Sequence, residues 1–280
     1  MPKQKRSPSS RPAARAGSVL IGHVLAAAGT RPDSGSAQSE KNAYAVRFAE
    51  HFGVALAEDL SPRFPGIEAT TSRGAASVRG AKQLDVNFST PQLGLALGMS
   101  LKSVHIREAK GAGRYTHNMK RNEEELRIEA SGYHRRQPYA VMVGVLCLPF
   151  DSCADAKTDR TSSSFGSWVR HLRPFAGRDR PGDDPDQFER LYVALYESDG
   201  ADLRFFDVRT APPRNGRPLM EGPLSQSGNP VDAPARALSY DEFLDAVHWT
   251  FLHRNRLVFS WADGSMDPLS PAAEHSGSDA

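Results

Sequence analysis

A run of apolar residues between Tyr139 and Phe150 constrains the fold more than any other feature of the chain. Val, Leu and Met fill most of its positions, without the alternation of apolar and polar residues that marks a half-exposed strand. A strand of this kind is buried on both faces, and a sheet buried on both faces needs helices on each side. The run is about a dozen residues long, whereas a membrane-spanning helix takes about 20. It therefore predicts the central strand of an α/β sheet.

The flanking segments supply helices and strands at the period each requires. Apolar residues recur at helical spacing over 41–60, and the charged segment 118–136 predicts a second helix that ends before Pro138. Between them, 83–89 and 93–106 alternate apolar and polar side chains, which predicts a β-hairpin. Further along, the pattern predicts helices at 163–175 and 239–254 and strands at 190–198, 202–209 and 257–261. This order favours a mixed α/β sheet in one domain.

Composition at the two ends sets the expected domain boundaries within the 280 residues. Residues 1–40 are rich in Pro, Ser, Arg and Gly, and we expect a disordered basic arm and linker there, with a short helix near 19–28. The folded domain is expected over 41–262, divided into a core at 41–150 and an elaboration at 151–262. We expect a disordered acidic tail at 263–280.

Charge is close to balanced overall but uneven along the chain. The formal net charge is +2, yet residues 1–42 hold seven basic and two acidic residues, and 102–136 hold nine basic and five acidic. Such asymmetry raises the question of a nucleic-acid partner. The two cysteines, Cys147 and Cys153, exclude a disulfide framework. A cytoplasmic location with no membrane association is the expectation.

One group of residues in the predicted hairpin points to chemistry. Side chains two apart on a strand share a face, so Ser100 and Lys102 point the same way. The other residues of that face, Gly94, Ala96 and Gly98, are small and leave room for a ligand. Strand pairing can place Asp85 next to them. A carboxylate suits Mg²⁺, which lowers the pKa of a bound water, and a lysine can orient that water or hold a phosphate. The alternatives are an ordinary ion-pairing aspartate at a sheet edge and a solvated lysine at a strand end.

These residues and the order of the elements around them resemble the PD-(D/E)XK nuclease core of restriction endonuclease-like proteins. The resemblance covers residues 41–150 and implies a restriction endonuclease-like mixed sheet flanked by helices. It implies that Asp85 is the metal-ligating aspartate and Lys102 the catalytic lysine. Leu84 stands where the motif has Pro, and Ser100 where it has Asp or Glu. Type II restriction enzymes often carry Ser there and take the missing carboxylate from the following helix.

Several glutamates are candidates for that carboxylate. Glu125 and Glu129 lie four apart in the predicted helix 118–136 and share a face, and Glu123 and Glu124 are their neighbours. By the same resemblance, Glu50 or Glu58 in the preceding helix is a further candidate metal ligand. The metal is expected to be Mg²⁺, with Mn²⁺ as a substitute. The alternative is that the run of three glutamates is a solvated helix face.

The loop after Lys102 and the start of the next helix form a candidate DNA-binding surface. Its side chains combine positive charge with an aromatic ring and an amide, a set suited to phosphate and base contacts. The candidates are Arg107, Lys110, Arg114, Tyr115, Asn118, Lys120 and Arg121. The alternative is a solvated basic loop.

The sequence thus favours a Mg²⁺-dependent DNA endonuclease of restriction or phage-defence type. We expect it to act on double-stranded DNA as a homodimer, with a methyltransferase as a possible partner. The main alternative is a non-catalytic nucleic-acid-binding or partner-binding subunit on a degraded nuclease fold, because Ser100 cannot replace the charge of a carboxylate. A nuclease of RNA or of DNA repair is a further alternative.

Overall fold

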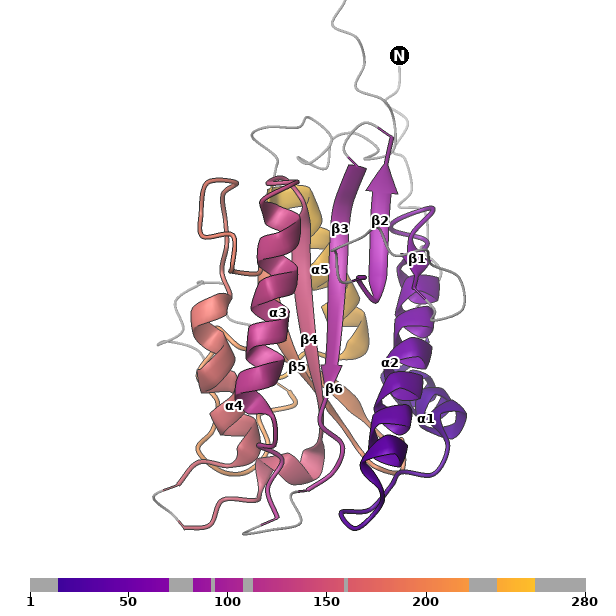
Figure 1. Cartoon of the computed structure of the whole chain (residues 1–280), viewed down its shortest axis with the longest axis vertical. Helices are drawn as coiled ribbons and strands as arrows, with labels where there is room; N and C mark the ends of the chain where they lie inside the picture. The colour runs from indigo at the N-terminus through magenta and orange to yellow at the C-terminus, as the bar shows by residue number, and fades with distance from the viewer. Residues whose placement is uncertain are drawn as a thin grey trace, which may run out of the picture.

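The computed structural model describes residues 15–70, 83–91, 94–107, 113–158, 161–221 and 236–254. Within these residues the chain forms a six-stranded mixed sheet with helices on both faces (Figure 1). The helices are α1 (Gly17–Ala28), α2 (Gln38–Leu60), α3 (Met119–His134), α4 (Ser164–Leu172) and α5 (Tyr240–Arg254). The strands are β1 (Glu68–Ala69), β2 (Val86–Thr90), β3 (Gly94–Ser103), β4 (Val141–Pro149), β5 (Arg190–Tyr196) and β6 (Leu203–Asp207).

The strands lie side by side in sequence order, from β1 to β6. The pairs β1–β2, β2–β3 and β5–β6 are antiparallel, whereas β3, β4 and β5 run parallel. The parallel crossovers pass through α3 and α4. This confirms the predicted hairpin and the α/β class. The two-residue strand β1 adds a further strand at the edge of the sheet, beside β2.

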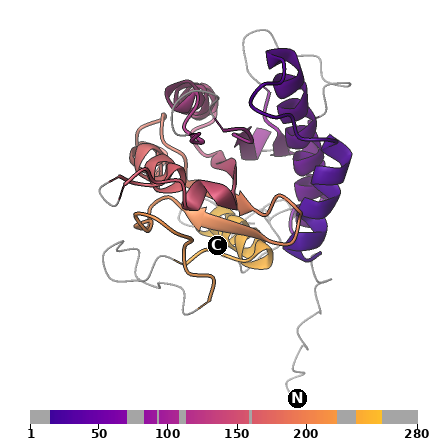
Figure 2. The same cartoon turned by 90° about the horizontal axis from the view of Figure 1, so that it is seen from below.

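Every residue of β4 is buried, as its apolar run predicts. Alternate side chains along it enter two different cores: Val143 packs with α2 and α5, and Met142 packs with α3 and α4. Figure 2 shows the sheet between these two layers of helices. Gly144 leaves room for the Leu191 side chain, because a Cβ at position 144 would lie 2.2 Å from Leu191 Cδ2 and force that side chain to shift.

Helix α1 corrects the expected N-terminal boundary. Its residues Leu20, Ile21, Val24 and Ala28 are fully buried in the same core as α2, and the Arg47 side chain donates a hydrogen bond to the carbonyl of Ala28 at 2.8 Å. A domain starting at residue 41 is therefore wrong, because this apolar stripe needs α2 for its burial. The start of the predicted arm, the expected strand at 257–261 and the acidic tail lie outside the described residues.

Candidate functional site

The β2–β3 hairpin holds Asp85 against the middle of β3. The backbone N–H of Asp85 donates a hydrogen bond to the carbonyl of Met99 at 3.1 Å. The carboxylate oxygen Oδ2 of Asp85 accepts a hydrogen bond from the Leu101 amide at 2.7 Å. Val86 pairs with Met99 in the antiparallel register. Asp85 thus lies beside the Ser100–Leu101 peptide, as the predicted strand pairing requires.

A carboxylate from α3 reaches both predicted site residues of β3. The Ser100 hydroxyl donates a short hydrogen bond to Glu129 Oε2, and Lys102 Nζ donates to Glu129 Oε1 at 2.8 Å. The Glu129 side chain is 2% exposed and that of Lys102 is 12% exposed. Glu125, one turn earlier on α3, lies 3.7 Å from Lys102 Nζ. The prediction that Glu125 and Glu129 share a face is therefore confirmed, and both face the lysine.

The other glutamates of the run are placed differently. Glu123 is buried and pairs with Arg127 at 3.2 Å, with His171 at 3.6 Å on its other oxygen. Glu124 is half exposed and lies 3.7 Å from Lys120. These two carboxylates point away from Lys102, because a helix turns by about 100° per residue. Glu129 is the carboxylate that contacts the Ser100 position.

Helix α2 closes on the hairpin at Gly53, a position that the sequence did not single out. A Cβ on Gly53 would lie 3.3 Å from the carbonyl oxygen of Asp85. The glycine lets the helix approach the strand end that carries Asp85. Glu50 lies one turn earlier on α2 and is partly buried. It is not among the residues that line the cleft described below.

Two carboxylates, those of Asp85 and Glu129, are held on one dipeptide of β3, Ser100–Leu101. Mg²⁺ is commonly bound by one or two carboxylates together with waters and substrate phosphates. The carboxylate oxygens of Asp85 and Glu129 are donors of the kind that this ion takes. Within the described parts of the chain, no group of three or more His, Cys, Asp or Glu side chains is placed to hold a metal ion.

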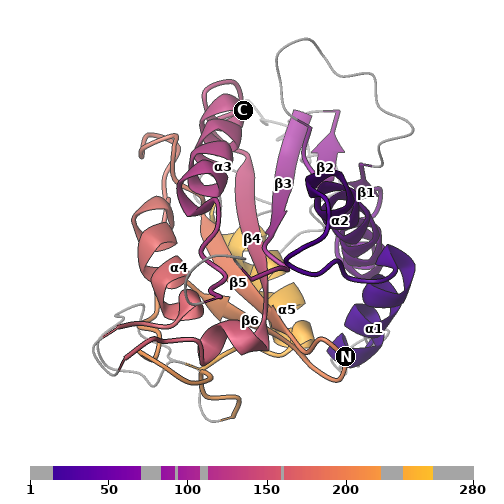
Figure 3. The same cartoon turned by 60° about the horizontal axis from the view of Figure 1, so that its bottom comes forward.

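A cleft of about 870 Å³ opens at the C-terminal end of β3, between α2 and the start of α3. Figure 3 brings this end of the molecule forward, with α2 and α3 on either side of the end of β3. Lys41, Lys102, Arg107 and Arg121 line it, and Glu125 is the single carboxylate among its lining residues. The cleft therefore has a positive character suited to a polyanion.

Three of the predicted DNA-binding residues line this cleft: Arg107, Asn118 and Arg121. Arg107 is half exposed and lies 3.4 Å from Asp151. Arg121 is largely exposed and pairs with Glu125 at 3.0 Å. Asn118 has a left-handed backbone, with φ of 57°, at the residue that precedes α3.

The remaining predicted DNA contacts fall elsewhere. Tyr115 is 1% exposed, and its carbonyl accepts a hydrogen bond from the Trp168 indole at 2.7 Å. The prediction that Tyr115 contacts a base is wrong, because the loop folds its ring into the core. Arg114 donates to the carbonyl of Ser162 at 2.6 Å and ties the loop to the segment before α4. Lys120 is exposed but is not a lining residue of the cleft. Lys110 lies outside the described residues.

His105 also lines the cleft and was not predicted as a site residue. Its ring is 4% exposed, and Nδ1 lies 2.7 Å from the Tyr196 hydroxyl. Burial, followed by the charge of Arg31, lowers the pKa of His105 to about 3. The imidazole is therefore neutral at physiological pH. No sequence pattern indicated it, since a lone histidine between Val104 and Ile106 resembles an ordinary strand-end residue.

Comparison of this chain with protein-family models, with curated proteins and with solved structures finds no match. Among the described helices, none combines the length and the apolar character needed to cross a membrane. The geometry of the site is thus the basis for the functional argument that follows.

Proposed function

We propose that this protein is a Mg²⁺-dependent endonuclease that hydrolyses phosphodiester bonds of double-stranded DNA. The observation that carries the proposal is the contact of Glu129 with both Ser100 and Lys102. Of the proposed site residues on β3 and α3, Lys102 and Glu125 line the basic cleft, whereas Asp85, Ser100 and Glu129 are not among its lining residues. A carboxylate from the next helix here lies against the serine that stands in the acidic position of the motif. The order α2, β1, β2, β3, α3, β4 supports a restriction endonuclease-like core.

Asp85 and Glu129 are the residues that would hold the metal ion. When bound, Mg²⁺ would lower the pKa of an attacking water and offset the negative charge on the phosphate. Asp85 is kept in place by the Leu101 amide, which donates a hydrogen bond to Oδ2 at 2.7 Å. Glu129 is kept in place by Ser100 and Lys102. Both carboxylates are thus oriented before any ligand arrives, which reduces the reorganisation that binding requires.

Lys102 has two tasks in this proposal. Its ammonium group balances the buried charge of Glu129 at 2.8 Å. It also lines the cleft, where it is placed to hold a phosphate oxygen or to orient the attacking water. Arg107 and Arg121 contribute charge for the flanking phosphates, and Glu125 sets the position of Arg121 at 3.0 Å.

Cleavage of supercoiled plasmid by the purified chain in Mg²⁺ or Mn²⁺ tests the proposal. Asp85→Asn, Glu129→Gln and Lys102→Met are each expected to lower the nicking rate by about 10²-fold or more, the range typical for loss of a group that acts on the transferred proton or charge. Lys157→Met, which removes an exposed lysine on another loop, serves as the matched control. Full activity in the Asp85 or Lys102 variant, with circular dichroism unchanged, would exclude the assignment.

A non-catalytic DNA-binding subunit is the second candidate. It is favoured by one observation: Lys102 and Ser100 already occupy the oxygens of Glu129. Binding of duplex DNA with no cleavage at any Mg²⁺ or Mn²⁺ concentration would support this candidate. Parallel assays on single-stranded DNA and RNA separate a DNA endonuclease from the RNA and repair alternatives. The role in restriction or defence, the homodimer and the methyltransferase partner remain predictions.

A further inference from the structure

A second pocket, of about 320 Å³, lies between the start of β5 and the end of α5. Because β3, β4 and β5 are parallel, their N-termini lie at the same end of the sheet. Arg190 begins β5 at this end, whereas Lys102 lies near the C-terminal end of β3. The pocket is therefore at the end of the sheet opposite the candidate nuclease cleft.

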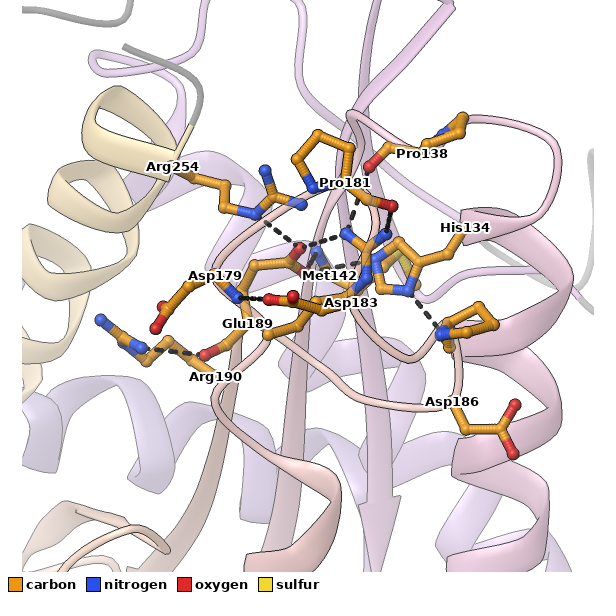
Figure 4. A network of polar contacts seen from close by, with 12 residues as sticks. His134, Pro138, Met142, Asp179, Pro181, Asp183, Asp186, Glu189, Arg190 and Arg254 are labelled. Atoms are coloured by element: carbon orange, nitrogen blue, oxygen red, sulfur yellow. Dashed lines mark hydrogen bonds and ion pairs between the residues drawn. The ribbon is translucent and has the colours of Figure 1, made fainter. Parts of the chain in front are cut away.

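Glu189, in the wall of this pocket, is fully buried and has both carboxylate oxygens occupied (Figure 4). Oε2 accepts from the Met142 amide at 2.7 Å and lies 3.2 Å from His134 Nε2. Oε1 accepts from Arg178 Nη1 at 3.2 Å and Arg254 Nε at 3.1 Å. One carboxylate thus pairs with two arginines. Among the described residues of the pocket wall, Asp179 is the other acidic residue, against the three arginines Arg178, Arg190 and Arg254.

Arg190 is the third of these arginines. Among the described residues, its side chain makes one hydrogen bond, from Nη1 to the backbone carbonyl of Glu189 at 2.9 Å. Within the same residues no carboxylate lies within 4.0 Å of its guanidinium. Its neighbour Arg209 is paired with Asp207 at 2.9 Å. Burial, followed by the charge of Arg209, lowers the pKa of Arg190.

Arg178 supplies a donor without an acceptor. The residue is 1% exposed, and its Nε is buried with no hydrogen-bond partner among the described residues. A buried N–H without an acceptor costs about 1–3 kcal/mol. Burial also lowers the pKa of Arg254, against the opposing effect of Glu189. An anion in the pocket would balance the positive charge of Arg190 and provide a hydrogen-bond acceptor for Arg178.

We propose that this pocket binds the phosphate of a small molecule, with Arg190 as its principal contact and Arg178 and Arg254 behind it. Guanidinium groups bind phosphate through paired, charge-assisted hydrogen bonds. Trp249 forms a further part of the wall: it is 54% exposed and stacks on His253, with ring centroids 4.3 Å apart. The aromatic wall gives a flat surface for a base if the phosphate belongs to a nucleotide.

Isothermal titration calorimetry of the full chain in EDTA tests this proposal, with inorganic phosphate and a nucleoside 5′-monophosphate as separate probes at constant ionic strength. We expect saturable binding of at least one probe to one site. Arg190→Gln should raise the Kd at least ten-fold. Arg190→Lys keeps the positive charge but loses the paired N–H donors of the guanidinium, and should raise the Kd less. Arg170→Gln removes an exposed arginine on α4 and should leave the Kd unchanged.

Lys102→Met distinguishes this pocket from the candidate nuclease cleft. A Kd raised by Lys102→Met and not by Arg190→Gln would place the bound phosphate in the cleft and overturn the proposal. Tighter binding of the nucleotide than of phosphate, lost in Trp249→Ala, would identify a nucleotide as the source of the phosphate. Equal affinities would identify the phosphate alone as the recognised group. Absence of binding to both probes, or equal weakening by Arg190→Gln and Arg170→Gln, would overturn the proposal.

Discussion

At the scale of single residues, Glu129 and Lys102 depend on each other. A carboxylate that is 2% exposed would be costly without a partner, and Lys102 provides one at 2.8 Å. The Ser100 hydroxyl donates a hydrogen bond to the other carboxylate oxygen of Glu129. The serine therefore does not replace a carboxylate. It leaves space for one that arrives from α3 and holds it in place.

His105 allows a pH test at the same scale. Its folded-state pKa is about 3, against an ordinary value of 6.5. The unfolded chain therefore takes up a proton below pH 6.5 that the folded chain excludes. The stability contributed by the neutral ring is complete above pH 6.5 and falls as the pH drops towards 3. The expected loss is about 2 kcal/mol by pH 5.

Urea unfolding at pH 7.5, 6 and 5 measures this effect. The free energy of unfolding of His105→Leu should fall less over this range than that of the unchanged chain. His117→Leu, which removes an exposed histidine, should retain the original pH dependence. The same slope in His105→Leu and in the unchanged chain would contradict the buried, neutral state of His105.

At the scale of elements, two helices bracket the hairpin and fix the site. Helix α3 supplies Glu129, and α2 packs against the strand end that carries Asp85. Glycine is tolerated in the middle of α2 despite its low helix propensity, because a Cβ on Gly53 would approach the Asp85 carbonyl at 3.3 Å. The position of Asp85 thus depends on the distance between a helix and a strand.

Substitutions at two helical glycines, Gly53 and Gly22, distinguish the effect of helix propensity on stability from the effect of packing against the hairpin. Gly53→Val should destabilise the chain by about 1–3 kcal/mol, because its branched side chain overpacks the contact with β2. Gly22→Ala on α1 places its Cβ in open space, with no atom within 4 Å. It should stabilise the chain by about 0.5–1 kcal/mol through helix propensity. Urea unfolding gives both values. A Gly53→Val chain as stable as the unchanged one would show that α2 does not press on the hairpin.

At the scale of the whole molecule, basic side chains gather at both ends of the parallel strands β3, β4 and β5. One end carries the cleft with Lys102, Arg107 and Arg121, and the other carries the pocket with Arg178 and Arg190. The net charge of +2 conceals both. A nearly neutral sum with local positive fields is what the proposed endonuclease would need, because a uniformly basic chain would release DNA slowly after cleavage.

Salt dependence of DNA binding tests the contribution of the cleft. The affinity for a short duplex is measured by fluorescence anisotropy without divalent metal, over a series of salt concentrations. Each phosphate contact contributes about 0.9 to the slope of log K against log salt. Replacement of Arg107 and Arg121 by Gln should reduce that slope by about 2 and weaken binding. Arg170→Gln should leave the slope unchanged. An unaltered slope in the double variant would place DNA elsewhere on the molecule.

The sequence by itself determined the hairpin and most of the other described elements, though not the short edge strand β1. The apolar run at 139–150 required a strand buried on both faces, and the alternation at 83–106 required an antiparallel pair that brings Asp85 to β3. Helical spacing also made Glu125 and Glu129 neighbours. These are properties of local periodicity, and a period of two or 3.6 residues is visible without knowledge of any distant contact.

Only the tertiary structure decided which side chains meet. The choice of Glu129 rather than Glu123 or Glu124 depends on how α3 is rotated about its axis over the sheet. The burial of Tyr115 depends on a loop folding back against Trp168, and the inclusion of α1 in the core depends on its contact with α2. The pocket at Arg190 joins residues from β5 and α5 that are about sixty positions apart. Contacts between distant segments leave no periodic signal in the chain, because they are fixed by packing of whole elements against one another.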